Sequence, residues 1–200
     1  MARLRPGWRI AVVITFALAS CGAPAAVSSP PTSCALDCAP GAGTPHAQVF
    51  VEPDAGAAPV LAAIAGATAS RDLGIYLLCD TSVIQALEEA ANRGVDVRVL
   101  LEYAPFGDAG TAAQITAEKL TAAGVHVKRS NPAFRYTHEK AMVVDQATAY
   151  IMSCNLTRSG LGGSSSAADR DYGVIDTDPQ DVSDSHSAGC RDDFLPFLVA

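Results

Sequence analysis

Residues 137–160, THEKAMVVDQATAYIMSCNLTRSG, contain two apolar runs with almost nothing between them. The first run covers 138–145 and the second covers 147–155, and both are rich in residues that favour β-strands. Two such runs joined by a very short link are typical of a β-hairpin. One end of this hairpin is polar, and it contains one of only three lysines in the chain.

Four polar side chains are expected to converge at that end. Side chains alternate along a strand, so His138 and Lys140 project from the same face. A two-residue turn at 146–147 pairs residue 145 with 148 and sets Lys140 opposite Ser153 and His138 opposite Asn155. An imidazole can attack phosphorus or move a proton, while an ammonium and a carboxamide can hold phosphate oxygens. The cluster therefore suits phosphate-ester chemistry, and it requires no acidic metal cage.

Strand and helix patterns alternate on either side of the hairpin. Apolar or alternating runs predict strands over 48–53, 73–79, 95–102, 125–128 and 170–176. Helical periodicity predicts helices over 56–70, 80–94 and 111–124. Residues 182–200 are rich in serine and are expected to make a poor final helix. The order predicts an α/β fold, in which helices cover a largely parallel sheet.

The first twenty residues have the form of an export signal. A basic start is followed by the apolar run 10–19, which is too short to span a bilayer comfortably. Leu18-Ala19-Ser20-Cys21 resembles a bacterial lipobox, so Cys21 is expected to be lipidated and to anchor the chain extracytoplasmically on the bacterial cell envelope. An ordinary signal peptide cleaved nearby is the alternative.

The remaining chain divides into a tether and one domain. Residues 21–47 are rich in Ala, Pro, Ser and Gly and predict a disordered tether. Residues 48–200 have the length of a single domain. The six cysteines fit an exported protein, and a disulfide between Cys79 and Cys154 is one possibility. The net charge of −7 argues against a protein that coats nucleic acid non-specifically.

The polar end of the hairpin also carries a resemblance to a known family. His138-x-Lys140-x4-Asp145, followed by Ser153-x-Asn155, resembles the HxKx4D signature of the phospholipase D superfamily. The segments VFVEPDAGAAPVLAAIAGA, IYLL, GVDVRVLLE and DYGVIDTD extend the similarity over residues 49–178. The resemblance implies a three-layer αβα sandwich with a mixed, mostly parallel sheet. It also implies phosphodiester cleavage through a phosphohistidine, with no cofactor.

The resemblance further implies a role for each polar residue. His138 is expected to be the nucleophile or the acid that protonates the leaving group. Lys140 and Asn155 would hold the phosphoryl oxygens, and Ser153 would line the substrate pocket. Asp171 stands where the family more often has glutamate, and its carboxylate would orient the histidine.

Asp145 and the number of motifs need separate interpretation. By strand alternation Asp145 faces away from His138, so it is expected to be structural. The family's site uses two motifs, and this chain has one. The sequence fits a homodimer that shares a site across a two-fold axis. It equally fits the first half of a two-repeat enzyme that has been cut short.

Three functions remain open from the sequence. Hydrolysis of phospholipid head groups is favoured, because the predicted lipid anchor keeps the chain beside a membrane. An extracytoplasmic, metal-independent nuclease is an alternative. The third is a truncated or non-catalytic phospholipase D-like envelope lipoprotein.

Overall fold

The computed structural model describes residues 46–107, 110–163 and 168–186. The predicted signal peptide, Cys21 and the tether up to residue 45 lie outside these ranges. The strands of the described chain are β1 (Ala47–Glu52), β2 (Ser70–Ile75), β3 (Asp96–Leu101), β4 (His126–Arg129), β5 (Lys140–Val144), β6 (Thr148–Met152) and β7 (Asp171–Asp176). The helices are α1 (Ala58–Gly66), α2 (Thr81–Asn92), α3 (Thr111–Ala122) and α4 (Pro179–His186).

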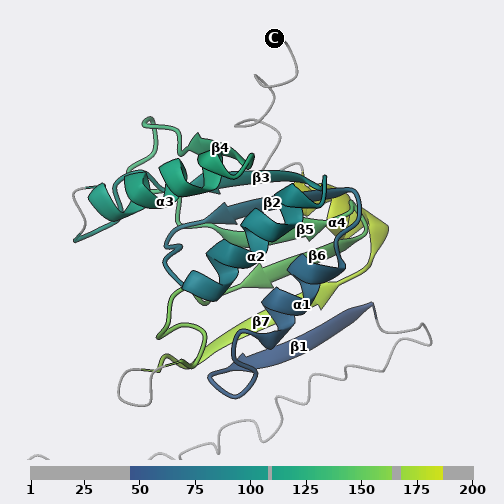
Figure 1. Cartoon of the computed structure of the whole chain (residues 1–200). Helices are drawn as coiled ribbons and strands as arrows, with labels where there is room; N and C mark the ends of the chain where they lie inside the picture. Colours follow the sequence, from purple (N-terminus) through teal and green to yellow (C-terminus); the bar gives the residue numbers. More distant parts are fainter. Residues whose placement is uncertain (1–45, 108–109, 164–167, 187–200) are drawn as a thin grey trace, which may run out of the picture. The chain divides into compact units, whose positions relative to one another are not determined.

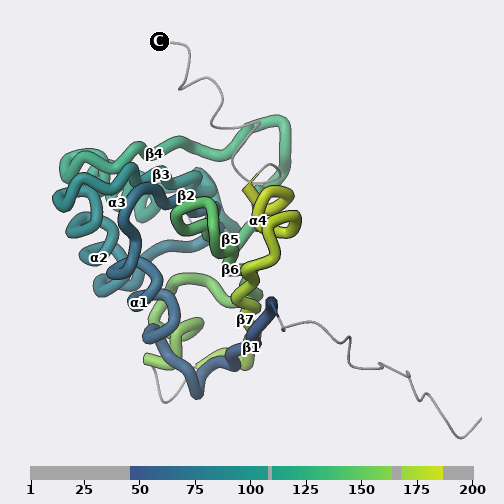
Figure 2. Tube along the Cα trace, turned by 90° about the vertical axis from the view of Figure 1, so that its right-hand side faces the viewer, coloured from purple at the N-terminus to yellow at the C-terminus, as the bar shows by residue number. Residues whose placement is uncertain are grey.

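The seven described strands form one mixed sheet between two layers of helices (Figure 1). Their order is β1-β7-β6-β5-β2-β3-β4. Helices α1, α2 and α3 lie on one face, and α4 packs on β5 and β6 from the other, as the view in Figure 2 shows. The predicted α/β sandwich with a mixed sheet is confirmed. Parallel pairing is confined to β2, β3 and β4, while β5 and β7 run opposite to the other five strands.

Strand β2 begins at Ser70, earlier than the predicted strand over residues 73–79. It includes two charged residues that precede the apolar run. Arg71 and Asp72 are fully buried. Arg71 Nη2 donates to Ala63 O at 2.6 Å, and Arg98 Nη2 on β3 donates to Asp72 Oδ2 at 2.7 Å. Burial lowers the pKa of Arg71 to about 10. Buried charges persist where such partners satisfy them.

Residues 182–186 belong to helix α4, although residues 182–200 were expected to make a poor final helix; residues 187–200 lie outside the described ranges. Asp178 Oδ1 accepts a hydrogen bond from Gln180 N at 2.8 Å, and Pro179 occupies the first helical position, where proline is favoured. Val182 is buried against Val143 and Ala149 of the sheet. These start signals and one apolar anchor outweigh the weak helix propensity of the serines. None of the helices in the described ranges is long and apolar enough to span a bilayer.

The edge strand β1 is held by an aromatic ring over a glycine. Phe50 on β1 pairs directly with Gly173 on β7. The Phe50 ring occupies the space that any Cβ at position 173 would need. Among the described strands, β1 pairs only with β7. The Phe50 ring over Gly173 is a side-chain contact between these two strands.

The turn between β5 and β6 differs from the prediction by one residue. Val144, not Asp145, pairs with Thr148, so the predicted hairpin register is wrong. Asp145 and Gln146 adopt positive φ angles of 50° and 53°, and Ala147 N donates to Val144 O at 3.0 Å. The link is therefore longer than the two residues expected.

Asp145 fastens this turn to the start of β2. Its carboxylate accepts hydrogen bonds from the backbone N–H groups of Thr68, Ala69 and Ser70 at 2.9 Å each, and from Thr68 Oγ1 at 2.8 Å. Burial by itself would raise the pKa of Asp145, but these hydrogen bonds outweigh it and hold the pKa well below its usual range.

Replacing Asp145 by Asn is expected to lower the free energy of unfolding by about 2 kcal/mol near neutral pH, because charged hydrogen bonds are lost. The stabilising contribution of a carboxylate with a depressed pKa is present above the unfolded-state value of about 3.9 and is lost as the pH falls through the folded-state value. The gap between wild type and Asp145→Asn should therefore narrow below about pH 4 in urea unfolding.

Asp54→Asn is the matched control, since the Asp54 carboxylate is exposed and its salt bridge within the described residues is an exposed one to Arg170 at 3.3 Å. It should change the free energy of unfolding by about 0.5 kcal/mol or less. A loss of similar size in both variants would contradict the structural importance of Asp145.

Candidate active site

Nearly all the predicted site residues lie along one edge of the sheet, the edge at which the ends of neighbouring strands meet. Strands β1, β2, β3 and β6 end at this edge, and β5 and β7 begin there. Lys140 pairs with Ile75, and Asp171 pairs with Glu52. Ser153 and Asn155 follow the end of β6. Asp145 lies at the other end of β5, so it takes no part in this edge.

Lys140 is a buried cation in contact with His138. Its side chain is only 7% exposed, and its Nζ lies 3.1 Å from His138 Nε2, 3.3 Å from Nδ1 and 3.2 Å from the carbonyl oxygen. Burial lowers the pKa of Lys140, while the charges of Asp171 and Cys154 act in the opposite direction. Among the described residues no salt bridge joins Lys140 to a carboxylate. A buried ammonium without a paired anion is a favourable binding site for an anionic group.

The Tyr76 ring packs against both His138 and Lys140. The rings of Tyr76 and His138 are 4.5 Å apart between centroids, and Lys140 Nζ lies 5.2 Å from the Tyr76 ring centroid. Tyr76 is itself fixed, because its N–H donates to Glu139 O and its hydroxyl accepts from Phe106 N at 2.7 Å. Sequence reasoning missed this residue. The available signal was an aromatic side chain in an apolar run that ends at the polar edge.

Glu102 positions the loop that presents His138, and it was also missed. Its carboxylate is 5% exposed and accepts hydrogen bonds from Ala104 N at 3.0 Å and Thr137 N at 2.7 Å. The residue before His138 is thereby tied to the end of β3. A glutamate that closes an apolar strand was the sequence signal, and Glu52 closes β1 in the same way.

Ser153 contacts Asp171 and not Lys140. If the observed ladder is continued, Met152 lies opposite Lys140, because the hairpin is shifted by one residue. Ser153 Oγ donates to Asp171 Oδ1 at 2.5 Å and accepts from Tyr172 N at 3.0 Å. In the described part of the chain, the hydrogen bonds of the His138 ring go to Lys140, and none goes to Asp171.

Asn155 lies beyond β6 with an unsatisfied side chain. Its Oδ1 is buried and has no hydrogen-bond partner among the described residues, and Thr137 Oγ1 is in the same state. Such orphaned buried atoms are rare in folded proteins and need a partner such as water, an ion or a ligand. Across the described ranges, no three His, Cys, Asp or Glu side chains lie close enough together to hold a metal ion.

Glu52, the cross-strand partner of Asp171, carries a buried carboxylate. Glu52 is fully buried; its Oε2 accepts from Gly56 N at 2.9 Å, and its Oε1 has no partner in the described chain. Burial raises the pKa of Glu52, the Gly56 hydrogen bond opposes this, and the charges of Asp171 and Asp54 raise the pKa further. Proton binding by Glu52 is therefore linked to the charge of Asp171.

Cys154 is buried near the carboxyl groups of Glu52 and Asp171. Burial, followed by the charges of Glu52 and Asp171, raises the pKa of Cys154 to about 11. Cys79 and Cys154 are both free thiols, so the disulfide considered between them does not form. A raised pKa keeps the Cys154 thiol protonated and unreactive at neutral pH.

Glu52→Gln tests the burial of this carboxyl group. A carboxyl group whose pKa is raised on folding lowers stability as the pH rises from the unfolded value toward the folded one. Glutamine cannot ionise, so it removes that loss. The melting temperature of Glu52→Gln minus that of wild type should therefore be larger at about pH 8 than at about pH 5. Glu102→Gln is the matched control and should lose stability at both pH values, because both Glu102 oxygens accept hydrogen bonds. A melting-temperature difference between Glu52→Gln and wild type that does not change with pH would contradict the raised pKa.

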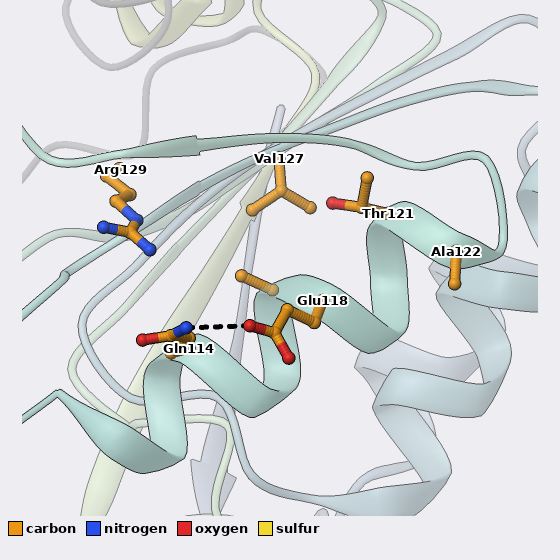
Figure 3. Close-up of a pocket in the computed structure, with 7 residues that line it drawn as sticks. Gln114, Glu118, Thr121, Ala122, Val127 and Arg129 are labelled. Carbon is orange, nitrogen blue, oxygen red and sulfur yellow. Dashed lines mark hydrogen bonds between the residues drawn. The ribbon is translucent and has the colours of Figure 1, made fainter.

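A larger hollow in the described chain lies away from this edge cluster. It has a volume of about 460 Å³ between α3 and β4 (Figure 3). Its polar lining includes Gln114, whose Nε2 donates to Glu118 Oε1 at 2.8 Å, together with Arg129. The lining of the hollow includes no histidine, cysteine or lysine, so the His138–Lys140 cluster is the better candidate for chemistry.

Comparison with known sequences identifies relatives of this arrangement. A family model described as "Cardiolipin synthase, PLD-like domain" matches residues 60–187. Cardiolipin synthase A from Pseudomonas aeruginosa is 39% identical over 82 residues, which are 40% of this chain and 16% of that protein. The protein of the same name from Pseudomonas putida is also 39% identical over 82 residues, 40% of this chain and 17% of that protein. The chain thus spans about a sixth of these relatives.

Solved structures share the fold. The phospholipase D family member Nuc from Salmonella typhimurium superposes with a TM-score of 0.64 at 24% identity, covering 74% of this chain and 93% of Nuc. NucT from Helicobacter pylori gives a TM-score of 0.58 at 16% identity, covering 70% of this chain and 91% of NucT. Since the family model covers more than half of the sequence, the chain belongs to the PLD-like domain family of the phospholipase D superfamily.

Proposed function

We propose that this chain is a phosphodiesterase in which His138 is the nucleophile, or the acid that protonates the leaving group, and Lys140 holds the phosphate. The observation that carries the proposal is the buried Lys140 ammonium, which contacts the His138 ring at 3.1 Å and forms no salt bridge within the described residues. A phosphate oxygen supplies the missing negative charge, and the same phosphorus then lies beside the imidazole.

The proposed reaction has two steps. A His138 nitrogen attacks phosphorus, a phosphohistidine forms, and the bond to the leaving alcohol breaks as that alcohol receives a proton. Water then attacks the phosphohistidine, passes its proton to the group that had protonated the leaving alcohol, and releases the phosphomonoester and the free imidazole. Asn155 is proposed to donate to a phosphoryl oxygen, and Asp171, held by Ser153, to stabilise the imidazolium.

The proton donor is proposed to be His138 of a second copy. The chain carries one HxKx4D motif, and a two-fold axis brings two identical surfaces together. This homodimer supplies an attacking histidine and a protonating histidine to a shared site. The unsatisfied hydroxyl of Thr137, which can donate a hydrogen bond, supports a site that a phosphate oxygen of the substrate completes.

Phospholipids are the proposed substrates. The family model's description and the named cardiolipin synthases support a lipid phosphodiester, as does the predicted lipid anchor at Cys21 on the extracytoplasmic side of the envelope. An extracytoplasmic nuclease is the competing substrate assignment. Release of a head group from vesicles, compared with cleavage of DNA under identical conditions, separates the two.

His138→Asn is expected to lower the cleavage rate of a soluble chromogenic phosphodiester by about 10²–10⁴-fold, measured with a chelator present. His126→Asn is the matched control, because His126 is exposed on β4 and lies outside the candidate site. Its rate should equal that of the wild type. Equal, measurable activity in wild type and His138→Asn would reject His138 as the catalytic residue, whereas no activity in a folded wild type would favour a non-catalytic envelope lipoprotein.

Mixing experiments test the shared site. If each dimer needs two intact histidines, a re-equilibrated equal mixture of wild type and His138→Asn should retain about one quarter of the activity of pure wild type at the same total protein concentration, because only one dimer in four is a wild-type homodimer. Independent sites would instead leave about half of the total activity of an equal amount of pure wild type. Sedimentation of the wild type should show a dimer; an active monomer would contradict the shared site.

A further inference from the structure

Two loops beside the candidate site carry exposed aromatic side chains. Phe106 follows β3 and is 83% exposed, and Phe134 follows β4 and is 63% exposed. Tyr103, also exposed, lies in the first loop beneath the guanidinium of Arg129, which is 4.0 Å from the ring centroid. We call the side chains Tyr103, Phe106, Arg129, Phe134 and Arg135 the aromatic rim.

The rim is built on the same supports as the site. Tyr103 N donates to Ser130 Oγ at 3.3 Å, so the two loops lie side by side. Phe106 N donates to the hydroxyl of Tyr76, whose ring packs on His138. A surface that binds the rim therefore lies next to His138.

The charge of the rim is opposite to that of the whole chain. Residues 103–107 and 128–137 contain Lys128, Arg129 and Arg135, and the acidic residues that flank these two ranges in sequence are Glu102, Asp108 and Glu139. The chain as a whole has a net charge of −7. Aromatic rings beside guanidinium groups match the boundary between acyl chains and anionic head groups of a bilayer.

We propose that the aromatic rim is a docking surface for a bilayer that contains anionic phospholipid. Phe106 and Phe134 enter the acyl boundary, and Arg129 and Arg135 face the lipid phosphates. Phe106 and Phe134 leave large apolar side chains in water, and insertion into the acyl boundary would remove that area from water. The inference goes beyond the proposed phosphodiesterase activity and does not depend on it.

Two other occupants fit the rim less well. A second copy related by a two-fold axis would set this cationic surface close to its own equivalent, and like charges oppose that contact. Nucleic acid would meet only three cations on a chain of net charge −7, whereas phosphate-backbone binding relies on many. Phenylalanine rings that project from loops suit insertion into a bilayer.

Tryptophan quenching reports the contact at the rim itself. The full-length chain contains one tryptophan, Trp8, which is replaced by Phe. Phe134→Trp and Phe106→Trp are then made separately and mixed with vesicles of phosphatidylcholine and phosphatidylglycerol that carry brominated acyl chains. Both introduced tryptophans should be quenched and shifted to the blue, because they lie within reach of the bromines.

Val49→Trp in the same background is the matched control. Val49 is 66% exposed on β1, at the opposite edge of the sheet from β4. Its tryptophan should not be quenched even if the amino-terminal segment binds the vesicles. Unquenched tryptophans at positions 106 and 134, or equal quenching at all three positions, would overturn the proposal.

Loss-of-contact variants give a second readout. Phe106→Ser and Phe134→Ser should each weaken vesicle binding by about tenfold. Arg129→Ala with Arg135→Ala should remove the preference for phosphatidylglycerol over phosphatidylcholine. If these variants abolish dimerisation or the binding of single-stranded DNA while vesicle binding persists, the rim belongs to one of those partners and the proposal fails.

Catalysis is measured separately. The tryptophan introduced by Phe134→Trp should remain quenched when His138→Asn is added, because docking requires no chemistry. Cleavage of the soluble diester without quenching would leave the phosphodiesterase standing and reject the docking surface. Quenching without cleavage would reject the phosphodiesterase and leave the docking surface standing.

Discussion

The antiparallel pairing of β2 with β5 is the constraint on which the rest of the structure depends. It joins the parallel strands β2, β3 and β4 to the antiparallel strands that follow in the sheet. At one end Asp145 holds the backbone of residues 68–70, and at the other Tyr76 N reaches Glu139 O. The spacing of the HxKx4D motif thus has a structural explanation. Its aspartate fixes the register of a strand whose far end presents His138 and Lys140.

Much of the fold follows from local sequence signals. Asp80 caps α2 by accepting from Ser82 N and Val83 N, and Gly94 and Gly124 end α2 and α3 with φ angles of 89°, as the pattern predicted. The start of β2 did not follow, because Arg71 and Asp72 resemble surface residues in sequence. Only distant partners make them suitable for the interior, and no local pattern encodes those partners.

The candidate site was predictable as a set of residues but not as a geometry. Its predicted members other than Asp145 lie at one sheet edge, yet Ser153 turns to Asp171 because the hairpin is shifted by one residue. That shift depends on positive φ angles at non-glycine residues in the turn, which sequence rarely reveals. Tyr76 and the strand-ending glutamates were missed because their importance comes from cross-strand neighbours.

The pairing of Phe50 with Gly173 has a consequence for the order in which the sheet is completed. Strand β1 precedes the other described strands in the chain, and its neighbour in the sheet is β7, the last strand described. Within the described chain β1 pairs only with β7, so these backbone hydrogen bonds cannot form until residues 171–176 have been synthesised. Contacts between such distant segments form slowly. Among the described strands, the pairing of β1 is therefore a late step in the assembly of the sheet.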